Sequence, residues 1–268
     1  MIAEALRLGR TAAYRIARPA DALLRRIAGR PILPPLWLRR HTGAVSRFES
    51  AARDTAAFLD SLGLVEPSHV VLDVGCGVGA MVPELERRLG PDGRYVGFDV
   101  HEPSIRWCRR RHAGDARLSF QHARVASAYG ERRGPAASTY RFPLDDGRAD
   151  LVLAKSLFTH LMPEDAAHYL SEIRRCLRPG RAAVVTAFLF DPDDGPAVER
   201  TRRAFPHGSR DGALRFRVRA RPTAAVAYAR PRFDALLAGA GLRLQWLSPG
   251  FFPGAERLAR QDTLLLGH

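Results

Sequence analysis

The chain of 268 residues predicts an α/β fold with a mostly parallel sheet. Short apolar, β-branched runs alternate with helical patterns from about residue 69 onwards. A glycine-rich turn follows the first of these runs and opens a helix. The hydrophobic content of 46% is ordinary for a chain that buries a core. Alternating strands and helices are joined by right-handed crossovers, which makes neighbouring strands parallel.

Hydrophobic periodicity assigns the individual elements in chain order. Helices are predicted over residues 1–30, 46–62, 80–89, 103–112, 163–177 and 233–240. Strands are predicted over residues 69–74, 94–100, 117–121, 149–154, 182–190, 242–247 and 263–266. Pro83 is tolerated because it lies in the first turn of its helix, where no backbone N–H is needed. We interpret residues 1–40 as a basic helical N-terminal extension and residues 41–268 as one domain.

Two long segments interrupt the alternation of strands and helices. Residues 125–140 precede the fourth strand, and residues 191–232 form an insertion after the fifth. Within this insertion, residues 214–219 alternate apolar residues and arginines, as a half-exposed strand does, with residues 223–228 as the predicted hairpin partner. Insertions at the carboxyl end of a sheet commonly serve as lids or binding loops.

The formal net charge is +14, and every basic residue except Lys155 is an arginine. Residues 1–40 carry nine arginines against two acidic residues, and residues 200–232 carry ten against one. Such a surface attracts nucleic acid, anionic lipid or acidic substrates. The plainer interpretation is a solvated, arginine-rich surface. Residues 1–40 are expected to pack on the domain, to cap its substrate site or to lie on a membrane surface.

Cysteine spacing and hydropathy indicate in which cellular compartment the protein is expected. Three widely spaced cysteines form no zinc-type pair, and an odd count argues against a disulfide framework. No run of about 18 apolar residues is present, and Arg7 and Arg10 interrupt the N-terminal apolar stretch. We therefore expect a cytoplasmic protein, with peripheral membrane contact through residues 1–40 as the remaining option.

The glycine turn has the spacing of a nucleotide-binding loop. Gly75 allows a tight turn, Gly77 lets a ligand approach the backbone, and Gly79 lets the helix pack closely on the strand. Because Ala80 follows, the same residues also satisfy the dinucleotide-binding pattern. Asp99 ends the second predicted strand, where its carboxylate would accept hydrogen bonds from both hydroxyls of a ribose.

Asp73 discriminates between a dinucleotide, which carries a pyrophosphate, and a cationic cofactor without phosphate. It precedes the first glycine by two residues, which predicts a carboxylate at the mouth of the site. Two unit charges 4 Å apart interact by roughly 4 kcal/mol at an effective dielectric of about 20. A pyrophosphate on this loop would therefore be repelled, whereas a sulfonium or ammonium group would be attracted. A cationic cofactor without phosphate fits better.

These motifs resemble those of the class I S-adenosylmethionine-dependent methyltransferases. Residues 71–79 (Val-Leu-Asp-Val-Gly-Cys-Gly-Val-Gly) are similar to motif I of that class, and residues 95–100 to the second motif. Further similar segments are residues 142–152, 156–161 and 169–180. Their order is that of the small-molecule subgroup often labelled methyltransferase domain type 11. The resemblance covers roughly residues 66–190 and implies a Rossmann-like, doubly wound sheet of seven strands, with residues 191–232 as a lid-like insertion.

The resemblance also implies the cofactor contacts, residue by residue. S-adenosylmethionine would be held at its methionine end by Asp73, Gly75, Cys76, Gly77 and Gly79. Asp99 would hold the ribose, Val100 would pack near the adenine, and the backbone around Lys155 would line the methionine pocket. Many relatives have an acidic residue after the third strand, where this chain has Ala123 and Arg124. Because arginine cannot accept a hydrogen bond, backbone groups of Ala123 and Arg124 are expected to contact the adenine, or cofactor affinity is reduced.

His160 is the candidate general base. It follows the fourth predicted strand, and histidine accepts a proton near pH 7. A hydroxyl acceptor benefits from such a base during methyl transfer. The alternative is that His160 only caps or packs against the next helix. Asp145, Asp146 and Gly147 are typical of a turn rather than of a metal site, so no metal is expected.

The predicted function is therefore S-adenosylmethionine-dependent methylation of a small-molecule acceptor, foremost a hydroxyl of a sugar, a glycan precursor or a natural product. The arginine-rich residues 200–232 of the insertion could bind an acidic or lipid-linked acceptor, which is therefore a further option. An RNA methyltransferase is an alternative, disfavoured because residues 154–157 (Ala-Lys-Ser-Leu) lack an aromatic surface for a flipped base. A second alternative is a degenerate, non-catalytic protein with this fold that serves as a partner subunit. A nicotinamide oxidoreductase is disfavoured by the negative charge of Asp73.

Overall fold

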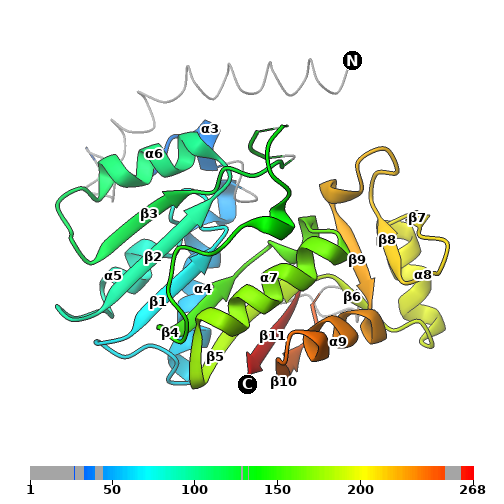
Figure 1. Ribbon diagram of the computed structural model, residues 1–268. Coiled ribbons are helices and arrows are strands. Elements are labelled where there is room, and N and C mark those ends of the chain that lie inside the picture. Colours follow the sequence, from blue (N-terminus) through cyan, green and yellow to red (C-terminus); the bar gives the residue numbers. More distant parts are fainter. Residues whose placement is uncertain (1–26, 28–32, 40–44, 128, 132, 251–260) are drawn as a thin grey trace.

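The computed structural model describes residues 27, 33–39, 45–127, 129–131, 133–250 and 261–268. Two layers of helices enclose a seven-stranded sheet, and the insertion after the fifth strand of this sheet lies beside it (Figure 1). The helices predicted over residues 1–30 lie almost entirely outside the described residues. None of the described helices is long and apolar enough to cross a membrane.

The main sheet has the predicted number of strands and is mostly parallel. Its strands are β1 (Val70–Val74), β2 (Arg94–Asp99), β3 (Leu118–His122), β4 (Ala149–Ala154), β5 (Leu177–Ala187), β10 (Arg243–Ser248) and β11 (Asp262–Gly267). They lie in the order β10-β11-β5-β4-β1-β2-β3, and β11 runs antiparallel to both of its neighbours. This arrangement confirms the predicted fold class and places β1 and β4 together at the centre.

Five helices cover the two faces of the main sheet. On one face lie α4 (Phe48–Ser61), α5 (Val82–Glu86) and α6 (Glu102–Arg111), and on the other α7 (Pro163–Cys176) and α9 (Arg230–Gly239). The apolar stripe predicted for α4 is confirmed, because Phe48, Ala52, Ala56 and Leu59 are its buried residues. Pro83 does lie in the first turn of α5. In α6 the glutamate of the first turn and the arginines of the last complement the helix dipole.

One predicted boundary was wrong. Residues 177–181 were assigned to the end of a helix and to a turn, yet β5 begins at Leu177, which pairs with Ala149 of β4. The Pro179-Gly180 pair lies within this strand instead of preceding it. Pairing with β4 resumes on both sides of the Pro-Gly pair, because the register shifts between Leu177 and Ala182 and Gly180 adopts a φ angle of 78° within this irregularity.

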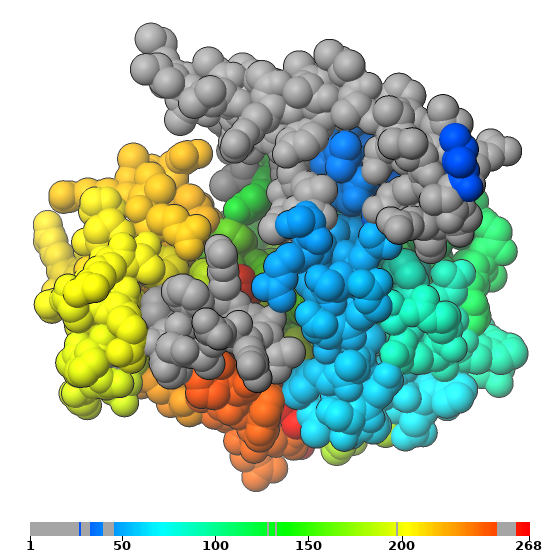
Figure 2. Space-filling model, turned by 180° about the vertical axis from the view of Figure 1, so that it is seen from behind, coloured from blue at the N-terminus to red at the C-terminus, as the bar shows by residue number. Residues whose placement is uncertain are grey.

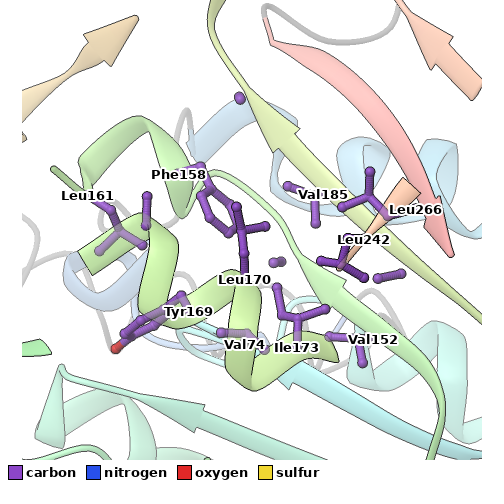
Figure 3. Close-up of a cluster of buried hydrophobic side chains, with 14 of the residues drawn as sticks. Val74, Val152, Phe158, Leu161, Tyr169, Leu170, Ile173, Val185, Leu242 and Leu266 are labelled. Carbon is purple, nitrogen blue, oxygen red and sulfur yellow. The ribbon is translucent and has the colours of Figure 1, made fainter. Parts of the chain in front are cut away.

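The core has one part on each face of the main sheet. Figure 3 shows the part beneath α7, where Leu170 and Ile173 lie among Val152, Val185 and Leu266 of the strands. All six residues of β4 are buried, as expected of a central parallel strand covered on both faces. Burying one such aliphatic side chain contributes about 1.5–3 kcal/mol. The two core parts therefore hold the carboxyl ends of β1 and β4 in fixed positions.

The insertion and the strand β6 just before it form a second, smaller sheet in the order β6-β9-β8-β7. Its elements are β6 (Leu189–Phe190), α8 (Gly195–Ala204), β7 (His207–Gly208), β8 (Leu214–Phe216) and β9 (Val226–Ala229). The predicted hairpin is confirmed, because β8 and β9 pair antiparallel, with Leu214 opposite Tyr228. Tyr228 also donates a hydrogen bond to the Leu161 carbonyl oxygen at 2.6 Å, which ties this sheet to the segment after β4.

Candidate cofactor and acceptor site

The glycine loop between β1 and α5 has the backbone conformation that its sequence predicts. Gly75, Gly77 and Gly79 have φ angles of 76°, 55° and 69°, a region that side chains with a Cβ atom rarely adopt. A Cβ atom at Gly79 would lie 3.0 Å from a methyl carbon of Val82 in α5. This agrees with the role predicted for Gly79 in close packing of helix and strand.

Four of the backbone N–H groups of this loop are used within the protein. Those of Gly75 and Cys76 both donate to the Phe98 carbonyl oxygen, at 2.9 and 3.0 Å. The N–H of Gly77 donates to Asp99 Oδ2 at 2.8 Å, and that of Gly79 to the Cys76 carbonyl oxygen at 2.9 Å. A phosphate-binding loop must instead aim its N–H groups at the ligand. The loop is therefore poorly suited to a dinucleotide.

Asp99, at the end of β2, holds the loop and still has acceptor capacity. Its Oδ2 accepts the Gly77 N–H, and its Oδ1 accepts the His101 N–H at 2.7 Å. Burial raises the pKa of Asp99, and these two backbone hydrogen bonds oppose that shift. An ionised carboxylate offers about four lone-pair positions. The two that remain could accept from the adjacent hydroxyls of a ribose, and this role of Asp99 stays a prediction.

Asp73 does not lie at an open mouth, which corrects the prediction. Residues alternate between the faces of β1, so Asp73 shares the α4–α6 face with Val71. The residue is 4% exposed, and its Oδ2 accepts a hydrogen bond from the Tyr95 hydroxyl at 2.7 Å. Burial raises its pKa to about 6, against the opposing effects of Tyr95 and of the charge on Lys155. Asp73 is thus largely ionised at pH 7, beneath the loop.

Lys155 follows β4, and its side chain points towards α4. Its Nζ donates to Thr55 Oγ1 at 2.5 Å and to the Ala51 carbonyl oxygen at 3.4 Å. Burial lowers the pKa of Lys155, and the charge of Asp73 opposes this shift. Because a cation lies near Asp73, the attraction of Asp73 for a cationic ligand is weaker than the sequence argument assumed. The role of the Lys155 backbone in lining a methionine pocket stays a prediction.

Ser156, which sequence reasoning missed, marks the turn after β4. It has a φ angle of 55°, a conformation that costs on the order of 1–3 kcal/mol for a non-glycine residue. Its N–H donates to Thr186 Oγ1 at 2.7 Å, so β5 holds the turn in place. Strained backbone of this kind clusters at functional sites. A steric signal of this kind is invisible in a single sequence.

Three further predicted residues lie around the ends of β2 and β3. Val100 is half-buried, and Gly130 packs so closely on its carbonyl group that a Cβ atom there would lie 2.4 Å from the oxygen. The N–H of Ala123 donates to the Asp99 carbonyl oxygen at 3.0 Å, so this N–H is already satisfied. Arg124 is exposed and lines a surface cavity of about 190 Å³. An adenine contact through the Ala123 N–H is therefore disfavoured.

The predicted base, His160, lies where the main sheet meets the insertion. It ends η4 (Phe158–His160), and its Nδ1 lies 3.0 Å from the carbonyl oxygen of Thr223 in η5 (Pro222–Ala224). Burial lowers the pKa of His160, the carbonyl groups of Thr223 and Ala224 oppose this, and the charge of Arg217 adds to it. His160 is therefore neutral at pH 7. Thr223 could not have been identified from the sequence, because it is distant along the chain.

The aspartate pair that was weighed as a metal site forms a turn. Asp146 accepts from Arg175 at 2.7 Å and from Arg141 at 3.1 Å. Gly147 has a φ angle of 63°, which suits the turn residue predicted there. The charge of Asp146 is thus already paired with two arginines.

The molecular surface is hollowed between α4 and the insertion. Figure 2 shows this hollow between the blue atoms of α4 and the yellow and orange atoms of the insertion, with green atoms from the middle of the chain at its floor. The carboxyl ends of β1, β2 and β4 all face the same edge of the sheet. In open α/β sheets this edge is where ligands bind.

The comparison with protein families decides the class. Residues 71–180, from β1 to the middle of β5, match the methyltransferase domain family. This segment includes the glycine loop, Asp99 and His160. The chain contains a class I methyltransferase domain. S-adenosylmethionine is the cofactor of that class. The glycine loop, in which the N–H groups of Gly75, Cys76, Gly77 and Gly79 already have acceptors, and the available lone pairs of Asp99 fit it.

Individual relatives agree with the class of this methyltransferase domain. The chain is 35% identical over 182 residues to nocamycin O-methyltransferase of Saccharothrix syringae, covering 66% of this chain and 55% of that protein. It is 36% identical over 110 residues to fatty-acid O-methyltransferase of Mycolicibacterium smegmatis, covering 41% and 34%. The chain spans about half the length of the first curated relatives that it matches.

The fold of the methyltransferase domain is also found in solved structures. One is an S-adenosylmethionine-dependent methyltransferase from Aquifex aeolicus, with a TM-score of 0.53 and 18% sequence identity. The match covers 85% of this chain and 95% of that chain. At this identity the likeness supports the fold alone.

Proposed function

We propose that the methyltransferase domain transfers the methyl group of S-adenosylmethionine to a hydroxyl of a small molecule, such as a sugar, a glycan precursor or a natural product. The observation that carries the proposal is a neutral, half-buried histidine in the segment after β4, the strand that lies beside β1 and its glycine loop. The curated relatives named above are O-methyltransferases, which supports oxygen as the acceptor atom.

The residues divide into a cofactor side and an acceptor side. Asp99 and the glycine loop would hold S-adenosylmethionine, which supplies an electrophilic methyl group when bound. On the acceptor side, the Thr223 carbonyl oxygen can only accept, so the Nδ1 of His160 carries the hydrogen. Its Nε2 therefore has a lone pair and can take the proton of a hydroxyl. The nearby carbonyl groups of Thr223 and Ala224 favour the imidazolium that then forms.

We further propose that the acceptor carries a negatively charged group. Arg217, Arg219 and Arg221 are exposed, lead into η5 and form no ion pair with any described residue. By contrast, Arg203 and Arg230 of the insertion pair with acidic side chains. The charge of Arg217 is close enough to lower the pKa of His160. A phosphate or carboxylate on the acceptor would suit these guanidinium groups. A lipid-linked acceptor, cytoplasmic location and membrane contact through residues 1–40 stay predictions.

The first experiment tests cofactor class and then acceptor class. Isothermal titration of the full chain with S-adenosylmethionine and with NADH should give heat with the former alone. Binding of NADH without S-adenosylmethionine would refute the proposal. Methyl-labelled S-adenosylmethionine is then offered with sugars, sugar phosphates, hydroxylated polyketides, fatty acids and, as nitrogen acceptors, small amines. Transfer of label to an acidic hydroxyl compound is expected, and transfer to nitrogen acceptors alone would contradict the proposal.

Two variants separate the roles of the proposed residues. Asp99→Ala should weaken S-adenosylmethionine binding by about tenfold to a hundredfold, because it removes hydrogen bonds worth about 1–3 kcal/mol. His160→Ala should leave that binding unchanged and lower turnover by about 10²–10⁴-fold, the usual contribution of a general base. Full turnover in His160→Ala would leave His160 with only a structural role. Asp92→Asn, at an exposed aspartate distant from both sides, is the matched control.

A further inference from the structure

The loop after β3 places a tyrosine against the proposed base. The hydroxyl oxygen of Tyr129 lies 3.2 Å from Nδ1 and 3.3 Å from Nε2 of His160. The two rings meet edge to face, with centroids 4.8 Å apart and an interplanar angle of 65°. Both side chains are half-buried. Tyr129 lay within the first interrupting segment of the sequence and was assigned no role.

The loop is held at both of its sides, so the position of Tyr129 is not incidental. The Tyr129 N–H donates to Ser127 Oγ at 3.1 Å, and the Ser127 N–H donates to the Glu131 carbonyl oxygen at 2.8 Å. Gly130, the next residue, is in close contact with the carbonyl group of Val100. The same short loop therefore touches the end of β2, on the cofactor side, and His160, on the acceptor side.

Hydrogen-bond chemistry orients the pair. Nδ1 of His160 donates to the Thr223 carbonyl oxygen at 3.0 Å, because that oxygen has no hydrogen to give. Nε2 then has a lone pair and no hydrogen, so it can only accept a hydrogen bond. The Tyr129 phenol has one hydrogen to donate, that of its hydroxyl group. Of the two ring nitrogens, only Nε2 can then accept the hydroxyl hydrogen of Tyr129. The phenol oxygen lies nearly equidistant from both nitrogens, so a rotation of one side chain must bring the hydroxyl onto the Nε2 lone pair before a proton passes. The phenol oxygen keeps its lone pairs, which can accept a hydrogen from a third group.

We propose that Tyr129 is a second proton-transfer residue of the site and lies between the acceptor hydroxyl and His160. This proposal rests on the function proposed above. As the acceptor oxygen bonds to the methyl carbon, the carbon–sulfur bond breaks and its electron pair stays on sulfur. The acceptor proton passes to the Tyr129 oxygen while the Tyr129 proton passes to Nε2. The positive charge lost from sulfur appears on the imidazole ring, so atoms and charge balance.

The surroundings of His160 allow that charge to form only transiently. The carbonyl groups of Thr223 and Ala224 favour the imidazolium, whereas burial and the charge of Arg217 disfavour it. No carboxylate is among the causes that shift the pKa of His160. The ring is thus neutral before the reaction and returns its proton to water afterwards. A ring that merely packed against His160 would need no hydroxyl at this position.

The deciding experiment reads the His160 ring directly and needs no acceptor. Full-length protein with ¹⁵N-labelled histidine is saturated with S-adenosylhomocysteine and studied by NMR at pH 7.5 as wild type, Tyr129→Phe and Tyr140→Phe. The control Tyr140 is another half-buried tyrosine, in the same interrupting segment. We expect hydrogen on Nδ1 in all three proteins and a shift of the Nε2 resonance in Tyr129→Phe alone. Hydrogen on Nε2, or an unmoved Nε2 resonance in Tyr129→Phe, would overturn the proposal.

Kinetics with the acceptor found above then measure the transfer step. Tyr129→Phe should lower kcat at least about tenfold, within the range that general acid–base groups contribute, with KM and cofactor affinity unchanged. A further test uses an acceptor whose hydroxyl is already ionised at the assay pH, for which the loss should vanish. An equal loss with that acceptor would show that Tyr129 acts through packing. Failure to methylate any of the offered acceptors would refute the proposed function and leave the NMR result unaffected.

Discussion

Replacing Asp73 by asparagine is expected to stabilise the fold at neutral pH. Asparagine has nearly the shape of a protonated aspartate, and its side-chain oxygen can still accept the hydrogen bond from Tyr95. In the wild-type protein the carboxylate is buried beneath the glycine loop, and its pKa is raised from 3.8 to about 6. Keeping this group ionised therefore costs free energy in the folded state, and the variant avoids that cost.

The magnitude follows from the difference in pKa. A pKa difference of one corresponds to about 1.4 kcal/mol, so a rise from 3.8 to about 6 is worth about 3 kcal/mol at pH 7.5. The folded-state value lies above the unfolded value, so wild-type stability falls as the pH rises through this range. The advantage of the variant should thus shrink to about 1 kcal/mol at pH 4.5 and vanish below the unfolded pKa.

Urea denaturation of wild type and Asp73→Asn at pH 4.5, 6 and 7.5 measures this difference. The exposed Asp92→Asn variant is the control and should follow the wild type at each pH. A variant less stable than wild type at pH 7.5 would refute the reasoning. So would a stability difference that does not change with pH. We also expect Asp73→Asn to bind S-adenosylmethionine more weakly, because a negative charge near a cationic ligand has been removed.

Three further substitutions test the packing and hydrogen bonds that position the site. Gly79→Ala should lose about 1–3 kcal/mol in urea denaturation, since its φ angle is 69° and the new Cβ would lie 3.0 Å from a valine methyl; an unchanged midpoint would contradict the loop geometry. Phe233→Ala, at a fully buried ring, should lose about 3–5 kcal/mol and lower Tm; a loss below about 1 kcal/mol would mean that the core collapses around it. Asp262→Ala should lose about 1–3 kcal/mol and speed proteolysis of the insertion, since it leaves the N–H groups of Leu189 and Gly250 without an acceptor; equal proteolysis would contradict this link.

Local patterns predicted most of the methyltransferase fold. The strand–glycine–helix unit from β1 to α5 was recognisable because its apolar run, its three glycines and Pro83 are neighbours in sequence. The apolar stripe of α4 and the β8–β9 hairpin were predicted for the same reason. Each depends on a period of 3.6 or 2, which a short window of sequence contains.

The direction of Asp73 shows where such patterns stop. Alternation predicts that Asp73 shares a face with Val71, but it does not say which face the hollow adjoins. That depends on the order β4-β1-β2 and on the packing of α4 over this part of the sheet. The sequence therefore identified the residue, and the burial of its carboxylate against Tyr95 came only from the assembled layers.

The sequence alone determined the fold class, the cofactor class and the presence of a histidine after the fourth strand. The three-dimensional structure decided that Tyr129 and Thr223 meet that histidine, and that the N–H groups of the three loop glycines and Cys76 donate within the protein. Secondary structure follows from neighbouring residues, whose steric and apolar preferences can be added along the chain. The partners of His160 are 31 and 63 residues away. Only closure of the sheet and of the insertion brings such residues together, because contacts at that separation depend on every element between them.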